Sequence, residues 1–194
     1  MPQASGLQFT ATIGEYSSDH FSVVGFALTE RLSELFQGRL DLASTDPSVV
    51  ASKVLEQPVD LVIWQDRAPL RRFTGVVSEF ARGDSGHRRT RYELVFRPPL
   101  WRLALMHNSR IFQNRGTDEI VRTLLEERGV VDTVFDLERR PEEREYCVQH
   151  RESDLAFVER LAAEEGWHYR YQHGSLDGQE PPALVFADHH RDSP

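Results

Sequence analysis

The sequence predicts an α+β fold in which antiparallel strands predominate. In the first hundred of its 194 residues, short apolar runs alternate with polar or glycine-containing turns, a pattern typical of strands in a barrel or sandwich. After residue 110, two amphipathic helical patterns each stand between strand-like segments, which is the order of a strand–helix–strand domain. These observations predict barrel-like β structure followed by a mixed domain.

Four strands are expected ahead of the clearest hairpin. Their apolar runs cover residues 7–13, 21–28, 40–44 and 59–64. Between the third and fourth runs, Asp46 and Pro47 suit the cap and the first position of a helix. We therefore expect a short helix from Pro47 through Val54.

The clearest prediction is a β-hairpin. Residues 72–82 and 88–97 flank the turn sequence GDSGH, and in the second strand Tyr92, Leu94 and Phe96 alternate with charged residues. This alternation is that of a strand with one buried and one solvated face. The hairpin is therefore expected in a sheet that covers a core.

Two helices with the same start signal are predicted in the second part. Residues 113–118 (QNRGTD) and 149–154 (QHRESD) share the pattern Q-x-R-x-[ST]-D, and each precedes an amphipathic run that ends at Gly129 or Gly166. Glycine is the residue most often found just past a helix C-terminus. The shared pattern is either an internal duplication or repeated use of one capping solution, and its meaning is structural in both cases.

The start signal also assigns roles to individual residues. Thr117 and Ser153 are expected to accept a hydrogen bond from a free backbone N–H at the start of each helix. Asp118 and Asp154 are expected to interact favourably with the positive end of the helix dipole.

In the second helix, a core stripe is predicted from the helical period. It comprises Leu155, Val158, Leu161 and Ala162, with Phe157 on its flank. The glutamates of this helix lie mostly on the other side and are expected to face water.

The remaining strands complete the domain plan. They are expected at residues 110–113, 130–135, 146–150 and 167–172, and at the apolar run before the sequence ADHH. We divide the chain into a barrel-like domain at residues 1–106, a strand–helix–strand domain at residues 107–175 and a further strand segment at residues 176–194.

Composition excludes several classes of protein. Hydrophobic residues make up 39% and charged residues 28%, which predicts a soluble globular chain. The net charge of −8 argues against nucleic-acid binding. The longest apolar run is far too short to span a bilayer, the N-terminus has no signal-peptide pattern, and a single cysteine fits a reducing cytoplasm.

Arginine residues gather in the middle third of the chain. They are Arg67, Arg71, Arg72, Arg82, Arg88, Arg89, Arg91 and Arg97. The cluster is either a solvated surface or a docking face for an acidic protein partner.

One group of residues looks catalytic but has a structural interpretation. Cys147 and His150 lie three residues apart, so in a strand their side chains point to opposite faces. We expect Cys147 to be buried and inert. His168 and His173 are expected on the solvent side of the last aromatic strand, and no metal or cofactor site is predicted.

A second group offers a weak catalytic alternative. Asp188, His189 and His190 follow an apolar strand, as in phosphoesterases with an Asp-His-His motif. Those enzymes use further aspartates at the ends of earlier strands to bind two metals, and no such aspartates are found here.

Several stretches together resemble one family, the VgrG spike proteins of type VI secretion. They are residues 73–77 (FTGVV), 92–105 (YELVFRPPLWRLAL), 109–114 (SRIFQN), 145–166 (EYCVQHRESDLAFVERLAAEEG) and 184–191 (LVFADHHR). The stretch at residues 145–166 is the most specific of them. The resemblance extends over essentially the whole chain.

The resemblance implies a fold like the baseplate hub of contractile phage tails and a structural, non-enzymatic role. Barrel-like domains of three subunits would form a ring that docks on the hexameric Hcp tube, and effectors or adaptors would be further partners. It implies assembly in the cytoplasm and export through the secretion system, without stable membrane insertion. Family members are much longer, so the chain looks like an N-terminal fragment, and trimerisation is expected of the full-length form.

Within this picture, Arg88, Arg89 and Arg91 at the hairpin turn are the candidate docking residues. Two alternatives remain. One is the tail hub of a phage or phage-like particle, and the other is a metal-dependent hydrolase that uses Asp188, His189 and His190.

Overall fold

The computed structural model describes residues 6–189 of the chain, and these residues form two compact units. Unit 1 comprises Met1–Glu30, Phe36–Pro98 and His173–Pro182, and unit 2 comprises Arg31–Leu35, Pro99–Gln172 and Ala183–Pro194. Each unit is therefore assembled from three separate stretches of sequence.

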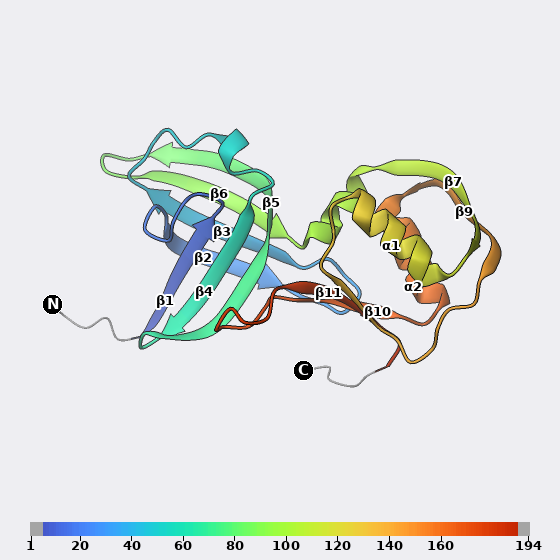
Figure 1. Cartoon of the computed structure of the whole chain (residues 1–194). Coiled ribbons are helices and arrows are strands. Elements are labelled where there is room, and N and C mark those ends of the chain that lie inside the picture. Colours follow the sequence, from blue (N-terminus) through green and yellow to red (C-terminus); the bar gives the residue numbers. More distant parts are fainter. Residues whose placement is uncertain (1–5, 190–194) are drawn as a thin grey trace. The chain divides into compact units, whose positions relative to one another are not determined.

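Unit 1 is built on a six-stranded antiparallel sheet with the order β1-β4-β5-β6-β3-β2 (Figure 1). The strands are β1 (Leu7–Ile13), β2 (Ser22–Thr29), β3 (Gln37–Ser44), β4 (Pro58–Gln65), β5 (Ala68–Ser85) and β6 (Thr90–Arg97). The sheet curls until its two edge strands meet through Phe9 and Phe26, whose ring centroids lie 5.2 Å apart. The prediction of a barrel-like, mainly antiparallel first part is confirmed.

The predicted hairpin is β5–β6, and its alternation is confirmed. Tyr92, Leu94 and Phe96 are 1%, 1% and 0% exposed, whereas Arg91 before them and Glu93 between the first two are exposed. The side chains on the inner face of β6 therefore contribute to the core of the barrel.

The helix predicted from Pro47 through Val54 is wrong. Only a single 3-10 turn, η1 (Ala51–Lys53), forms there. The Asp46 carboxylate accepts bonds from both the backbone N–H and the hydroxyl of Ser48, at 2.8 and 2.5 Å. The bond to the Ser48 N–H is the one that a helix cap would make, but residues 48–50 do not continue as a helix. Such Asp and Ser contacts also stabilise non-helical turns.

Unit 2 contains two helices, two small sheets and a 3-10 segment. Its elements are η2 (Pro99–Leu105), β7 (His107–Arg115), α1 (Thr117–Glu127), β8 (Thr133–Asp136), β9 (Arg144–Ser153), α2 (Asp154–Glu164), β10 (His168–Gln172) and β11 (Ala183–Ala187). β7 and β9 form a two-stranded antiparallel ribbon, and β10, β11 and β8 form a three-stranded sheet with β11 and β8 parallel. Figure 1 shows the β7–β9 ribbon curving around the two helices.

The predicted core stripe of α2 needs one correction. Val158, Leu161 and Ala162 are buried as expected, but Phe157 is 0% exposed and Leu155 is only half-buried. Phe157 stacks on Phe112 of β7, with ring centroids 5.9 Å apart. The ribbon covers a side of α2 that the helical period alone assigned to the flank.

The two predicted helix caps have different outcomes. Ser153 is confirmed, because its Oγ accepts from the Ala156 N–H at 3.1 Å. The capping role predicted for Thr117 is wrong, because Gly116 is the N-cap of α1. The Thr117 hydroxyl instead donates to Glu165 at 2.6 Å. A hydrogen bond to a carboxylate is stronger than a neutral one, so the buried hydroxyl binds Glu165, the C-cap of α2, rather than its own helix.

Replacing Ser153 with alanine should lower the free energy of unfolding by about 1 kcal/mol, because a free N–H of α2 loses its acceptor. Ser153→Asp keeps an acceptor at the same position and should cost much less. Urea denaturation monitored by circular dichroism measures both variants. Equal losses in the two variants would contradict the capping role.

Candidate partner-binding surface

The candidate docking arginines lie at the β5–β6 turn. We define the hairpin tip as residues 82–91. The turn closes through a bond from the Gly86 N–H to the Arg89 carbonyl at 2.9 Å. Thr90 is the first residue of β6 and pairs with Ser44, the last residue of β3. The turn therefore lies beyond that pairing, at the end of the sheet (Figure 1).

The arginines of the hairpin tip are exposed and carry few contacts. Arg88, Arg89 and Arg91 are all exposed. Arg89 donates to the Ser22 hydroxyl at 3.1 Å. Among the residues that the structure describes, none of the three forms an ion pair with a carboxylate, so their charges are available to a partner.

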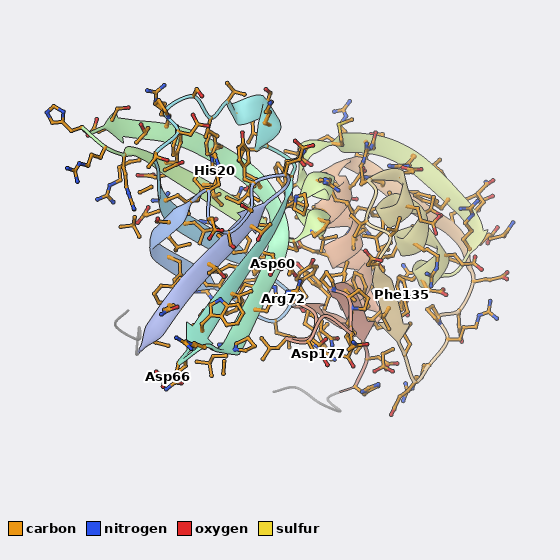
Figure 2. All side chains as sticks on the ribbon, turned by 60° about the vertical axis from the view of Figure 1, so that its left-hand side comes forward. His20, Asp60, Asp66, Arg72, Phe135 and Asp177 are labelled. Atoms are coloured by element: carbon orange, nitrogen blue, oxygen red, sulfur yellow. The ribbon has the colours of Figure 1, made fainter. Side chains whose placement is uncertain are left out.

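Other arginines of the same sequence cluster have internal roles. Arg72 forms a two-bond pair with Asp60 on the neighbouring strand, at 2.9 and 2.7 Å (Figure 2). Arg97 pairs with Glu79 at 2.9 Å. The cluster therefore contains arginines that pair with carboxylates within the sheet, and arginines at the hairpin tip that do not.

His173 contradicts the expectation of a solvent-side residue. Its side chain is 11% exposed and lies against Phe36 and Phe73, with centroid distances of 4.8 and 5.1 Å. Nδ1 accepts from the Thr74 N–H at 3.0 Å, and Nε2 lies 2.7 Å from Glu30. The residue is a structural anchor within unit 1. Alternation along β10 missed this role because His173 follows the end of that strand.

The most densely bonded group in unit 2 is the carboxylate of Asp154, which is fully buried. Its oxygens accept hydrogen bonds from Asn108, Gln149, Arg110 and Arg128, at 2.8–3.2 Å. Burial acts to raise the pKa of the Asp154 carboxyl, but these four donors together outweigh it and hold the pKa below its usual value. The carboxylate stays charged and fully bonded, so it is a structural group rather than a base or nucleophile.

The sequence pattern identified Asp154 only as a favourable charge at a helix start. The structure shows that it joins the ribbon, the end of α1 and the start of α2. The sequence offered one signal of a buried polar network. Gln149 has the same strand parity as Cys147, which is expected to be buried, and in the structure Gln149 is 0% exposed. A buried amide in a strand requires polar partners.

The glutamates of α2 do more than face water. Arg160 pairs with Glu152 and Glu164, and Arg144 pairs with Glu164 and Glu165. The Arg144 guanidinium, assisted by Arg160, holds the pKa of the Glu164 carboxyl below its usual value despite some desolvation. This chain of ion pairs joins β9 to α2.

The Cys147 and His150 pair has the predicted geometry. Cys147 is 5% exposed and His150 is exposed, on opposite faces of β9. Burial raises the pKa of the Cys147 thiol, so the reactive thiolate is disfavoured. The prediction of a buried cysteine separated from His150 is confirmed.

The hydrolase alternative gains no support from the described residues. Both carboxylate oxygens of Asp188 accept backbone N–H bonds, from Glu138 at 2.8 Å and Arg139 at 3.1 Å, and these bonds lower its pKa. His189 lies 3.4 Å from Asp136, and His190 lies outside the described residues. Within residues 6–189, no three histidine, cysteine, aspartate or glutamate side chains are grouped as a metal site would require.

No helix in the described part of the chain is long and apolar enough to cross a membrane.

Comparison with known proteins identifies relatives of this arrangement. Residues 29–194 match the family model described as phage tail baseplate hub (GPD). The chain is 37% identical over 191 residues to the type VI secretion system spike protein VgrG3 of Vibrio cholerae, covering 94% of this chain and 18% of the relative. It is 44% identical over 166 residues to VgrG2b of Pseudomonas aeruginosa, covering 86% of this chain and 16% of that protein. The chain thus spans less than a fifth of the length of these relatives.

A solved structure has the same fold. The Escherichia coli c3393 protein, a type VI secretion component described as similar to the T4 bacteriophage tail proteins gp27 and gp5, matches with a TM-score of 0.75 and 27% identity. The match covers 96% of this chain and 47% of that one. The resemblance to VgrG spike proteins and the hub-like fold predicted from the sequence are confirmed.

Proposed function

Since the chain belongs to the phage tail baseplate hub family, we propose that it is the hub region of a type VI secretion spike and acts by binding other proteins. In this role it would assemble in the cytoplasm, dock on the hexameric Hcp tube and be exported with the spike. As part of a longer chain it would form a homotrimer and carry effectors or adaptors. A tail hub of a phage-like particle is the alternative within the same family, and the identity to the spike proteins of Vibrio and Pseudomonas favours secretion.

The observation that carries the docking proposal is the hairpin tip. Arg88, Arg89 and Arg91 are exposed, are joined to no described carboxylate, and stand at the end of a barrel-like sheet. Arginine presents a rigid fork of donors that suits carboxylates, so the partner surface should be acidic. A ring of identical subunits would repeat the contact and multiply its strength.

Charge reversal tests this role. Each of Arg88→Glu, Arg89→Glu and Arg91→Glu should weaken binding to purified Hcp hexamers about tenfold or more, mainly through slower association, because like charges then face each other. Biolayer interferometry at two salt concentrations measures the effect, which should shrink at high salt.

Arg67→Glu is the matched control, since Arg67 is an exposed arginine at the other end of β5. It should leave Hcp binding unchanged. If Hcp binds all four variants as it binds the unmodified protein, the hairpin tip is not the docking surface.

A further inference from the structure

The β7–β9 ribbon has only two strands, so each strand has one edge that faces away from the other. Ile111 of β7 and Val148 of β9 are directly opposed. The Val148 carbonyl accepts a bond from the Arg160 guanidinium of α2 at 3.0 Å. Opposed residues in an antiparallel pair alternate between those that bond to each other and those whose backbone groups point apart. The bond from α2 shows that Ile111 and Val148 point apart, and that the β9 edge is covered at this position.

A second bond gives the same alternation along β7. The N–H of Asp154, the residue after β9, donates to the carbonyl of Met106, the residue before β7, at 3.0 Å. The extra residue at the shift in register, Arg151, lies in β9, so the alternation runs through β7 without interruption. Every second residue counted from Met106 bonds to β9, and the residues between them point away from it. The backbone groups of Ile111 and Gln113 therefore point away from β9.

The edge of β7 that carries these groups is open. Within residues 6–189, no backbone or side-chain group bonds to the N–H or the carbonyl of Ile111 or Gln113, and both residues are exposed. An open strand edge is a template for pairing with another chain, and proteins commonly block it with proline or lysine. β7 contains neither residue. Its edge is therefore available for a further strand.

Apolar side chains lie on the outward side of the ribbon beside this edge. Ile111, Tyr146 and Val148 are 63%, 60% and 48% exposed. Ile111 is opposed to Val148, and Tyr146 is opposed to Gln113, two residues further along the ribbon. Directly opposed side chains on one face lie about 5 Å apart, so the three form one patch, which we call the ribbon patch. Exposed apolar patches mark surfaces that bind other proteins.

The charge of β7 limits the kind of segment that fits beside it. The strand contains basic residues and no carboxylate. Arg115 is exposed, and its only bond within the described residues goes to the Thr123 hydroxyl, at 3.3 Å. The β7 strand of a second copy is a poor partner, because pairing the two copies at Ile111 sets Arg115 of each beside the basic His107 of the other. That pairing also needs a two-fold axis, which a homotrimer lacks.

We propose that an extended segment of another protein adds to the open edge of β7 as a third strand of the ribbon. Backbone bonds to Ile111 and Gln113 supply affinity, as in other cases of strand addition. Alternate side chains of the segment lie on the side of the ribbon patch, so the segment carries an apolar residue beside Ile111 and a carboxylate beside Arg115. The inference rests on the proposed function in one respect, since the segment would belong to an effector or adaptor that the spike carries.

A synthetic peptide of nine residues, the length of β7, is the probe. In this peptide valine alternates with threonine, and both ends are glutamate. Nuclear magnetic resonance of the labelled protein measures binding and amide hydrogen exchange. The amides of Ile111 and Gln113 should exchange freely in the unbound protein and about tenfold or more slowly with the peptide bound. The amide of Phe112, which faces β9, should be protected in both states.

Gln113→Pro removes one of the donors on the edge. Because the Gln113 N–H is not bonded to β9, proline should be tolerated here as it is on other edge strands. The variant should bind the peptide about tenfold more weakly, since it loses a hydrogen bond and the ring obstructs the edge. Gln113→Ala is the matched control, because it removes the side chain but keeps the N–H, and it should bind as the unmodified protein does.

Two N-methylated peptides repeat the test without altering the protein. One carries methyl groups on the odd-numbered backbone nitrogens and the other on the even-numbered ones. A strand presents alternate N–H groups to its neighbour, so only one of the two peptides should lose binding.

Four results would overturn the proposal. They are protection of the Ile111 and Gln113 amides before peptide is added, no binding of the peptide, equal binding by Gln113→Pro, and an equal effect of the two methylated peptides. Sedimentation velocity tests for a second copy as the occupant. Self-association that Gln113→Pro abolishes would assign the edge to another copy of this chain and would overturn the proposal as well.

The outcome is separable from that of Hcp docking. The hairpin tip belongs to unit 1 and β7 to unit 2, so Gln113→Pro should retain Hcp binding. Peptide binding without Hcp binding would refute only the docking proposal, and Hcp binding without peptide binding would refute only the strand addition.

Discussion

Replacing Asp154 with alanine should lower the free energy of unfolding of unit 2 by about 3–5 kcal/mol, because removing one partner of a buried ion pair leaves the others uncompensated. Arg128 would lose its only described carboxylate partner, whereas Arg110 would keep Glu127. The buried amide of Gln149 would lose an acceptor as well. Urea denaturation followed by tryptophan fluorescence reports on this unit through Trp101 and Trp167.

Asp118 provides the matched control, since it holds the same position in the first copy of the Q-x-R-x-[ST]-D pattern. It lies in the first turn of α1 and is half-buried. Asp118→Ala should cost about 0.3–1 kcal/mol, the value of a charge at a helix N-terminus. Similar losses for the two alanine variants would show that the buried network contributes little.

The low pKa of Asp154 also predicts a dependence of stability on pH. Since the pKa of the folded state is lowered, the stabilising contribution is fully present above the unfolded-state value of about 3.9 and is lost as pH falls through the folded-state value. Asp154→Asn removes this titration. The stability gap between the unmodified protein and Asp154→Asn should therefore narrow on acidification below about pH 4.

Most elements were predictable because their signals are local. The period of two in β6 and β9, and the start signal at Ser153, depend on neighbours within a few residues and are confirmed. The turn that exposes Arg88 and Arg89 is local too, so their exposure followed from sequence. That no carboxylate in the described part of the chain pairs with them could not be predicted, because the pairing of arginines depends on which strands become neighbours.

The features that the sequence did not reveal depend on contacts between residues that are far apart in the chain. Thr117 and Ser153 occupy equivalent motif positions, yet only Thr117 has Glu165 within reach. Residues 31–35 and His173–Pro182 each join the unit that their flanking sequence does not belong to, and no periodicity signals this. The buried environment of Asp154 likewise arises from two strands and two helices that meet only in the folded state.

Gly38 is another residue whose role no local pattern revealed. It lies directly opposite Phe96 across β3 and β6, and a Cβ built on it would stand 2.1 Å from the Phe96 ring. The ring is 0% exposed, and a Cβ on Gly75 would also meet it, at 3.0 Å. The aromatic ring therefore occupies space that two glycines leave open in the barrel core.

Gly38→Ala should lower the free energy of unfolding of unit 1 by about 3 kcal/mol, because the added methyl group overlaps the buried ring and forces it or the backbone to shift. Gly25→Ala in β2 is the matched control. The nearest atom to its Cβ is a flexible carboxylate oxygen of Asp41 at 3.5 Å, so its effect should stay within about 0.5 kcal/mol. Urea denaturation monitored by circular dichroism measures both.

A double-mutant cycle decides whether the Phe96 ring causes the loss. Phe96→Leu alone should destabilise unit 1 by removing buried aromatic contacts. In the Gly38→Ala background, the smaller side chain also relieves the overlap, so the double variant should lose less stability than the two single losses combined. Since contacting residues couple and independent ones do not, strictly additive losses would show that the added methyl group is accommodated elsewhere in the barrel.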